Sequence, residues 1–217
     1  MAAAPDKPGR EAGSKTAPID LWSALALSAA ALVTAYASYQ AELWDGQQAA
    51  FYSQANALHT ESSQENLTAN QLETADLLIF SAWLNARGAG EDRLETFYHE
   101  RFRPDFLRAF DAWIATNPQT NPQAPPTPFA MPDYRLAQRA HAQALDAQAK
   151  RAFEQGQDAN EHGDAFVLGT VILASALFFG GINQIPHSLK TRIILLAVSA
   201  IFFVVGGVYI ATLPPAP

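Results

Sequence analysis

The densest group of polar side chains lies in a segment rich in aromatic residues. It comprises His99, Glu100, Arg101, Arg103 and Asp105, with Phe102 and Phe106 among them. Two arginines this close together can hold an anionic ligand through paired guanidinium donors. The alternative is a set of ion pairs on a helix surface, with Glu100 and Arg103 as neighbours three residues apart. Of the two interpretations, we favour the ion-pair set.

No motif in the sequence specifies a reaction. The histidines at 59, 99, 141 and 162 are widely scattered, and no H-E-x-x-H pair places two of them at the spacing of metal ligands. The chain has no cysteine, which excludes thiolate metal sites and thiol nucleophiles. A G-x-S-x-G elbow, a phosphate-binding glycine loop and a pair of catalytic carboxylates are also absent. We therefore expect a protein that is not an enzyme and has no metal or cofactor.

A second polar group is purely acidic and flanks two long apolar runs. It consists of Glu42, Asp45, Asp158, Glu161 and Asp164. In a homo-oligomer, such residues can ring a vestibule and concentrate cations at the mouth of a channel. The alternative, which we favour, is that the outer flanks of membrane spans look acidic because they lack Lys and Arg.

The elements that position these residues begin with three apolar runs, at 21–41, 164–185 and 193–213. Each run is about 20 residues long, and a helix of that length crosses a hydrocarbon core of roughly 30 Å. Backbone groups in lipid must find partners within the segment, so the runs are predicted to be transmembrane helices. For the first run, the small-x-small pattern at 35–37 leaves a cleaved signal peptide as the alternative. The length of the run and of the tail before it favours a membrane span.

Positive charges near the runs predict the orientation. Lys7, Arg10 and Lys15 precede the first run, and Lys190 and Arg192 lie between the last two, whereas 41–59 has neither Lys nor Arg. Lys and Arg near the ends of spans favour the cytoplasmic side. We therefore expect a disordered cytoplasmic tail at 1–20 and a cytoplasmic loop at 186–192. The region 42–163 and the tail 214–217 are expected on the opposite side.

The region 42–163 is predicted to be helical throughout, so the fold class is an all-α membrane protein with a helical bundle inserted between the first and second spans. An apolar stripe runs along 51–83 but is interrupted by Glu65 and Asp76. Gly88 to Gly90 ends this helix, and Pro104 should kink or split the helix expected at 91–116. The proline-rich stretch 117–132 is expected to form an extended strap. A last helix begins near Asp133.

Small residues in the spans suggest close helix packing. The small-xxx-small pairs are Ala31 with Ala35, Ala176 with Gly180, and Gly207 with Ala211. Such pairs let helix backbones approach in lipid, although alanine-rich spans also generate them by chance. They favour self-association or docking on a larger membrane complex. The net charge of −7 argues against a nucleic-acid partner.

Three segments, 97–106, 109–113 and 121–134, carry a resemblance. Their sequences FYHERFRPDF, AFDAW and NPQAPPTPFAMPDY are similar to a signature of small bacterial membrane proteins that have no known activity. The resemblance extends over most of the chain, including one early and two late spans. It implies a bacterial inner-membrane protein, and with the orientation predicted from the charges the main domain is expected in the periplasm. It brings no site residues.

Together these features predict a non-enzymatic membrane protein that acts in assembly, as a homo-oligomer or as an accessory subunit. The first alternative is an oligomeric ion channel, with Ser28, Thr34, Thr170 or Ser175 lining a pore below the acidic residues. The second alternative is a membrane sensor that binds a ligand at the aromatic segment. It is the weaker one, because the tail at 1–20 and the loop at 186–192 leave little room for a cytoplasmic output module.

Overall fold

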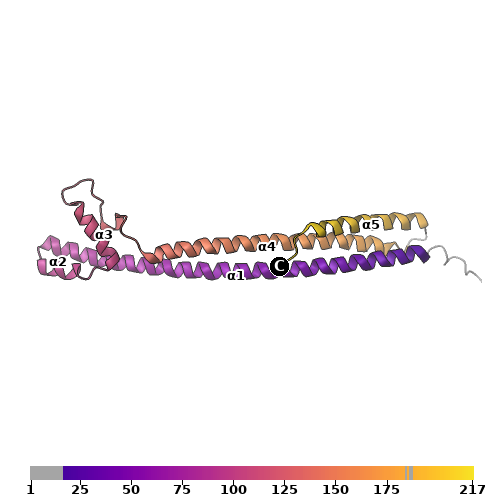
Figure 1. Cartoon of the computed structure of the whole chain (residues 1–217), viewed down its shortest axis with the longest axis horizontal. Coiled ribbons are helices and arrows are strands. Elements are labelled where there is room, and N and C mark those ends of the chain that lie inside the picture. Colours follow the sequence, from indigo (N-terminus) through magenta and orange to yellow (C-terminus); the bar gives the residue numbers. More distant parts are fainter. Residues whose placement is uncertain (1–16, 184, 186–187) are drawn as a thin grey trace, which may run out of the picture. The chain divides into compact units, whose positions relative to one another are not determined.

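The computed structural model describes residues 17–183, 185 and 188–217, and these residues are mainly helical. The elements are α1 (Ala17–Ala89), α2 (Asp92–His99), α3 (Pro104–Ala115), the 3₁₀ turn η1 (Pro128–Ala130), α4 (Ala137–Ile182) and α5 (Leu189–Thr212) (Figure 1). No strand occurs in this part of the chain, so the all-α prediction is confirmed. Helices α1, α4 and α5 are each long and apolar enough to cross a membrane.

Two predicted boundaries are corrected. The expected tail at 1–20 lies mostly outside the described residues, but 17–20 already belong to α1. The expected loop at 186–192 is shorter, because α5 begins at Leu189 and includes Lys190 and Arg192. Ser188 is the N-cap residue of α5. The helix therefore begins four residues, slightly more than one turn, before the apolar run.

The chain divides into two compact units. The span unit consists of Met1–Phe51 and Glu154–Pro217, and the aromatic unit consists of Tyr52–Phe153. Helices α1 and α4 contribute residues to both units. The span unit includes α5, and the aromatic unit includes α2, α3 and η1 (Figure 1).

Small side chains let the three helices of the span unit pack closely. Its core contains Ala37, Ala41, Phe166, Leu173 and Ile210. A Cβ atom on Gly206 would lie 2.9 Å from Leu173 Cδ2, and one on Gly180 would lie 2.6 Å from Leu27 Cδ2. Such distances are shorter than real Cβ contacts, so a larger residue at either position would force the neighbouring leucine to shift.

Polar contacts add to the packing of the span unit. Ser199 Oγ donates a hydrogen bond to the Ala176 carbonyl at 2.7 Å, which joins α5 to α4. Trp44 Nε1 donates to the Pro214 carbonyl at 3.3 Å, and the Ala216 amide donates to Gln40 Oε1 at 2.8 Å. These last two bonds hold residues 214–216 against α1.

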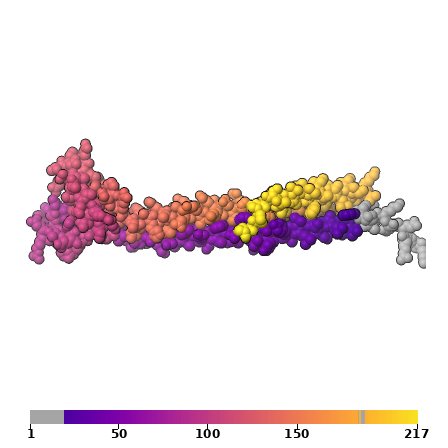
Figure 2. Space-filling model, in the orientation of Figure 1, coloured from indigo at the N-terminus to yellow at the C-terminus, as the bar shows by residue number. Residues whose placement is uncertain are grey.

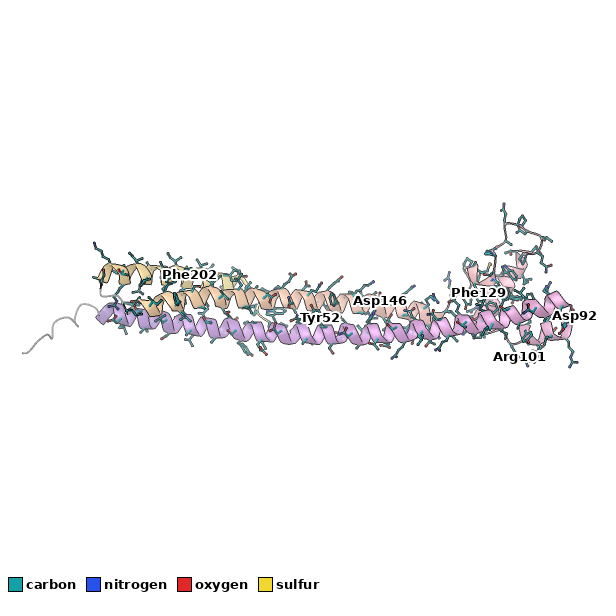
Figure 3. All side chains as sticks on the ribbon, turned by 180° about the vertical axis from the view of Figure 1, so that it is seen from behind. Tyr52, Asp92, Arg101, Phe129, Asp146 and Phe202 are labelled. Atoms are coloured by element: carbon teal, nitrogen blue, oxygen red, sulfur yellow. The ribbon has the colours of Figure 1, made fainter. Side chains whose placement is uncertain are left out.

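In the aromatic unit, α1 and α4 form an antiparallel pair with a narrow interface. Ala55, Ser62 and Ala69 of α1 are buried at seven-residue intervals, the repeat of helices that wind around each other. Ser62 Oγ donates to the Ala142 carbonyl at 2.8 Å. Tyr52 stacks on Phe153 of α4 with ring centroids 5.2 Å apart (Figure 3). Small residues thus bring the two backbones close together, as in the span unit.

Beyond this pair, α2, α3 and the strap at 117–132 pack around the last turns of α1 (Figure 2). Gly90 adopts φ +73°, which ends α1. Pro104 splits the predicted helix into α2 and α3. It takes the first position of α3, where a backbone N–H would have no partner within the helix. The aromatic cluster consists of Phe80, Trp83, Phe102, Phe106, Phe110 and Trp113.

The strap folds back onto this aromatic cluster. Trp113 Nε1 donates to the Pro125 carbonyl at 2.8 Å. Phe129, in η1, stacks on Phe106 with ring centroids 5.0 Å apart (Figure 3). The proline-rich sequence therefore has a defined place in the aromatic unit.

Candidate functional site

The predicted polar cluster does not converge on one site. Arg101 lies over the Phe97 ring at 3.5 Å and donates to the Phe97 carbonyl at 2.8 Å. Asp105 pairs with Arg108 at 2.6 Å on the surface of α3. His99 packs against the rings of Phe102 and Phe110. These side chains thus point into different surroundings, which leaves no shared anion site.

The predicted pairing of Glu100 with Arg103 is wrong. Arg103 instead forms a bidentate ion pair with Asp76 of α1, through Nε to Oδ1 at 3.0 Å and Nη2 to Oδ2 at 3.2 Å. Glu100 is exposed and ends α2, while Arg103 is the N-cap residue of α3. The break between the two helices removes the three-residue helical spacing on which the prediction relied.

Asp76 is the most deeply buried charged residue of this region. Its side chain is 1% exposed, and the Tyr134 hydroxyl also donates to Oδ2 at 3.0 Å. The Asp76 hydrogen bond raises the pKa of Arg103. Burial, followed by the same carboxylate, raises the pKa of Tyr134 far above its usual range. The three residues therefore join α1, the start of α3 and the short segment between the strap and α4.

Asp76 was predicted to interrupt the apolar stripe, and this interpretation is corrected. It occupies the same seven-residue series as Ala55, Ser62 and Ala69, and lies at the buried side of α1. The sequence held this signal, because an acidic residue on a buried position requires a cationic partner. Both carboxylate oxygens are fully used within the chain, so the network stabilises the fold and offers no vacant ligand position.

Two adjoining hollows lie beside the aromatic cluster. One has a volume of about 310 Å³ and is bordered by Trp113 and by 117–120 of the strap. The other, of about 300 Å³, is bordered by His99 and Phe110. Arg87 separates them, 5.2 Å over the Trp83 ring and 2.7 Å from Glu95. The guanidinium is already paired with a carboxylate, and both hollows are lined by a mixture of polar and apolar side chains.

The predicted acidic group is exposed in the span unit. Glu42, Asp45, Asp158, Glu161 and Asp164 all face solvent in a single chain. Asn160 Nδ2 donates to Asp164 Oδ2 at 3.2 Å, and Gln48 Nε2 donates to Asn160 Oδ1 at 2.8 Å. Within the described residues, no three His, Asp or Glu side chains gather closely enough to hold a metal ion.

The small residues of the spans fall into two groups. Ala176 and Gly180 lie at contacts between helices, as does Gly206. Ala31, Ala35 and Ala211 are exposed, and a Cβ on Gly207 would meet nothing within 4 Å. Packing within the chain therefore uses Gly206 in place of Gly207. On α1 it uses Ala30, Ala37 and Ala41, which are centred about 120° around the helix from Ala31 and Ala35.

Ala31 and Ala35 belong to a larger face of α1 that the chain leaves open. Ala24, Ser28, Ala31, Ala35 and Ser38 follow one another at alternating steps of four and three residues, and all five are exposed. We call them the small-residue face. Ser28 bonds to the Ala24 carbonyl of its own helix at 2.8 Å. Thr34, Thr170 and Ser175 also bond to carbonyls within their own helices.

A polar network that the sequence did not reveal joins the three long helices. Asn183, which is fully buried, donates from Nδ2 to Ser23 Oγ at 3.2 Å and to the Gly180 carbonyl at 3.0 Å. Arg192 Nε donates to the Asn183 carbonyl at 3.1 Å, and its Nη2 pairs with Asp20. The arginine thus caps the end of α4 from the first turn of α5.

A scan against protein-family models and searches of curated proteins and of solved structures find no match to this chain. The function is therefore inferred from the geometry of the two units.

Proposed function

We propose that this chain is a non-enzymatic integral membrane protein that acts in assembly, as a homo-oligomer or as an accessory subunit of a membrane complex. The observation that carries the proposal is the small-residue face of α1. Its five residues are exposed although α1 packs closely against its neighbours on another side. An uncovered small-residue surface in a membrane span favours contact with another helix.

Membrane physics supports this assignment. Lipid tails are as apolar as leucine, so helices in a bilayer associate through close backbone approach and hydrogen bonds. Leu25, Leu32, Tyr36 and Tyr39 share the adjoining surface of α1 and are exposed. These large side chains are suited to contact lipid, whereas the small-residue face can fit against the backbone of a second span.

We further propose that the protein resides in a bacterial inner membrane with the helical bundle of 42–163 on the periplasmic side. Lys190 and Arg192 at the connection from α4 to α5 support a cytoplasmic location of that connection. Cysteine variants at Lys190 and Asp158 allow a direct test, because the chain has no cysteine of its own. A reagent that cannot cross the membrane should label Asp158→Cys in intact spheroplasts and leave Lys190→Cys unlabelled; the reverse pattern would invert the orientation.

The test of assembly is the mass of the protein in density-matched detergent, measured by sedimentation equilibrium. The wild type should sediment as a multiple of one chain. Ala31→Leu combined with Ala35→Leu should shift it toward a single chain, because two isobutyl groups keep the partner helix away. Ala174→Leu is the matched control, since Ala174 is exposed on α4 outside the small-residue face. Equal masses for all three proteins would show that the small-residue face does not mediate assembly.

An ion channel is the second candidate, and one observation favours it. Ser28 and Ser38 lie on the small-residue face, and Glu42 follows Ser38 by four residues on the same side of α1. If several copies surrounded a common axis through this face, hydroxyls would line it and carboxylates would ring one end. Bilayer recordings with the pure protein should then show cation currents that Glu42→Gln reduces. Silent bilayers across voltage and pH would eliminate this candidate.

A further inference from the structure

The part of α1 within the aromatic unit has a second open face, which carries no charge. Its residues are Thr60, Gln64, Leu67, Gln71, Thr74, Leu78, Ser81 and Asn85, and all eight are exposed. We call them the uncharged face. An exposed helix surface in water normally carries charged side chains. A face of eight positions without one therefore requires an explanation.

The charges of this part of α1 lie on its other sides. Glu73 pairs with Arg139 at 2.7 Å, and Glu65 lies 3.5 Å from His141, so both face α4 or the approach to it. Asp76 is buried, and Arg87 lies over Trp83. The outer surface of α4 differs from the uncharged face, because it exposes Lys150 and Arg151.

The spacing of the uncharged face is that of a coiled-coil interface. Its steps alternate between four and three residues from Thr60 to Asn85, which is the interval of the two core positions in a heptad repeat. Leu67 and Leu78 are the apolar members, and they are 60% and 67% exposed. The remaining six residues end in hydroxyl or amide groups. The hydroxyls of Thr60, Thr74 and Ser81 donate to carbonyls of their own helix and can still accept hydrogen bonds, while the amides can do both.

We propose that the uncharged face pairs with the same face of a second copy of this chain, as a parallel and in-register coiled coil. The inference rests on the proposed function in one respect: insertion in a membrane gives both copies the same direction. A two-fold interface of this kind sets each core residue opposite its own copy. Any charged residue would therefore meet a like charge, whereas hydroxyls, amides and leucines are compatible with themselves.

The composition of the interface fits a weak contact, one that forms only when the span units already hold two chains together. Two leucines per chain provide little apolar area, and polar residues at core positions lower stability while fixing the register. Association of the span units raises the local concentration of the aromatic units, so a weak contact is enough. The pairing therefore depends on the membrane and supplies register and orientation to the assembly.

Neighbouring leucines provide a sharp test by cysteine cross-linking in the full chain, reconstituted in lipid vesicles. Leu77 and Leu78 are both exposed, but they point about 100° apart on the helix. A disulfide needs Cα atoms within about 7 Å of each other, which a parallel coiled coil provides only at its core positions. Mild oxidation should convert most of the Leu78→Cys and Leu67→Cys variants to covalent dimers. The Leu77→Cys variant should stay monomeric.

Equal cross-linking at positions 77 and 78 would reflect random collision and would overturn the proposal. The Ala31→Cys variant, on the small-residue face, distinguishes the proposed coiled coil from assembly through the membrane spans. If it forms dimers while the Leu67→Cys and Leu78→Cys variants do not, the coiled coil is refuted and assembly through the spans stands. If none of the three forms dimers, both the coiled coil and homo-oligomeric assembly through the small-residue face are refuted.

A second measurement does not depend on disulfide geometry. Leu78→Glu would place two carboxylates side by side at the proposed interface, whereas Leu77→Glu would place them outside it. Both positions are exposed, so both variants should fold, as circular dichroism can verify. The proposal expects Leu78→Glu alone to lower energy transfer between fluorophores attached near the strap. Equal transfer in the two variants would contradict it.

Discussion

The span unit and the aromatic unit both pack α1 against α4 through small residues, but the aromatic unit adds a contact of another kind between α1 and α3. In the span unit the contacts depend on missing side-chain atoms, at Gly169, Gly180 and Gly206. In the aromatic unit, α3 and its flanking residues contact the end of α1 through a cluster of six large aromatic side chains, two of them from α1 itself, and through a buried ion pair. Lipid rewards close approach of backbones, whereas water rewards the burial of apolar area. Helix α1 is therefore packed by close backbone approach in the span unit and, in addition, by burial of aromatic side chains in the aromatic unit.

The largest effect is expected from removing the cationic partner of the carboxylate that the aromatic unit buries. Arg103→Ala should destabilise this unit by about 3–5 kcal/mol, because it leaves Asp76 buried without its cationic partner. Hydrogen exchange of α3 amides in the full chain would report the loss. Adding Asp76→Asn to Arg103→Ala should recover part of it, since no buried charge remains. A loss below the level of an exposed ion pair would show that the aromatic rings alone hold the unit.

Two adjacent glycines test the dependence of the span unit on close approach. Gly206→Ala should destabilise it by about 1–3 kcal/mol, because the new Cβ would crowd Leu173 at 2.9 Å. Gly207→Ala should cause no such loss, since a Cβ there meets nothing within 4 Å. Thermal unfolding in lipid discs, followed by circular dichroism, would compare the two. Equal midpoints would contradict the packing of α5 against α4.

The tyrosine of the buried network predicts a pH dependence. Burial and the Asp76 carboxylate raise the pKa of Tyr134, so the folded chain keeps this proton to higher pH than the unfolded chain. Its contribution should be complete below about pH 10, the ordinary pKa of tyrosine, and should fall as the pH rises further. Tyr134→Phe should cost about 1.5 kcal/mol at neutral pH. It should also weaken the alkaline loss, as unfolding titrations would reveal; identical profiles above pH 10 would contradict this.

An exposed ion pair gives the smallest expected effect. Arg139→Ala removes the contact with Glu73, in which both side chains are nearly half exposed. Solvent screens such pairs, so the loss should be less than about 1 kcal/mol. Hydrogen exchange near the start of α4 would measure it. A loss as large as that of Arg103→Ala would mean that burial is not what distinguishes the two ion pairs.

The sequence predicted the apolar helices and the helical class because their signals are local. Long runs without charge and the position of Pro104 act within a few residues. The partner of Asp76 could not be read in the same way, since Arg103 and Tyr134 lie 27 and 58 residues away in the chain. The choice of Gly206 over Gly207 depends on the rotation of α5 against α4. Spacing of small residues alone does not fix that rotation.

We expect the chain to assemble in the membrane. The most direct test is native mass spectrometry of the wild-type protein released from lipid discs. We expect a homo-oligomer at a whole multiple of 23.5 kDa, or one chain bound to a second protein. A single species of 23.5 kDa, in discs that preserve known membrane dimers, would contradict it.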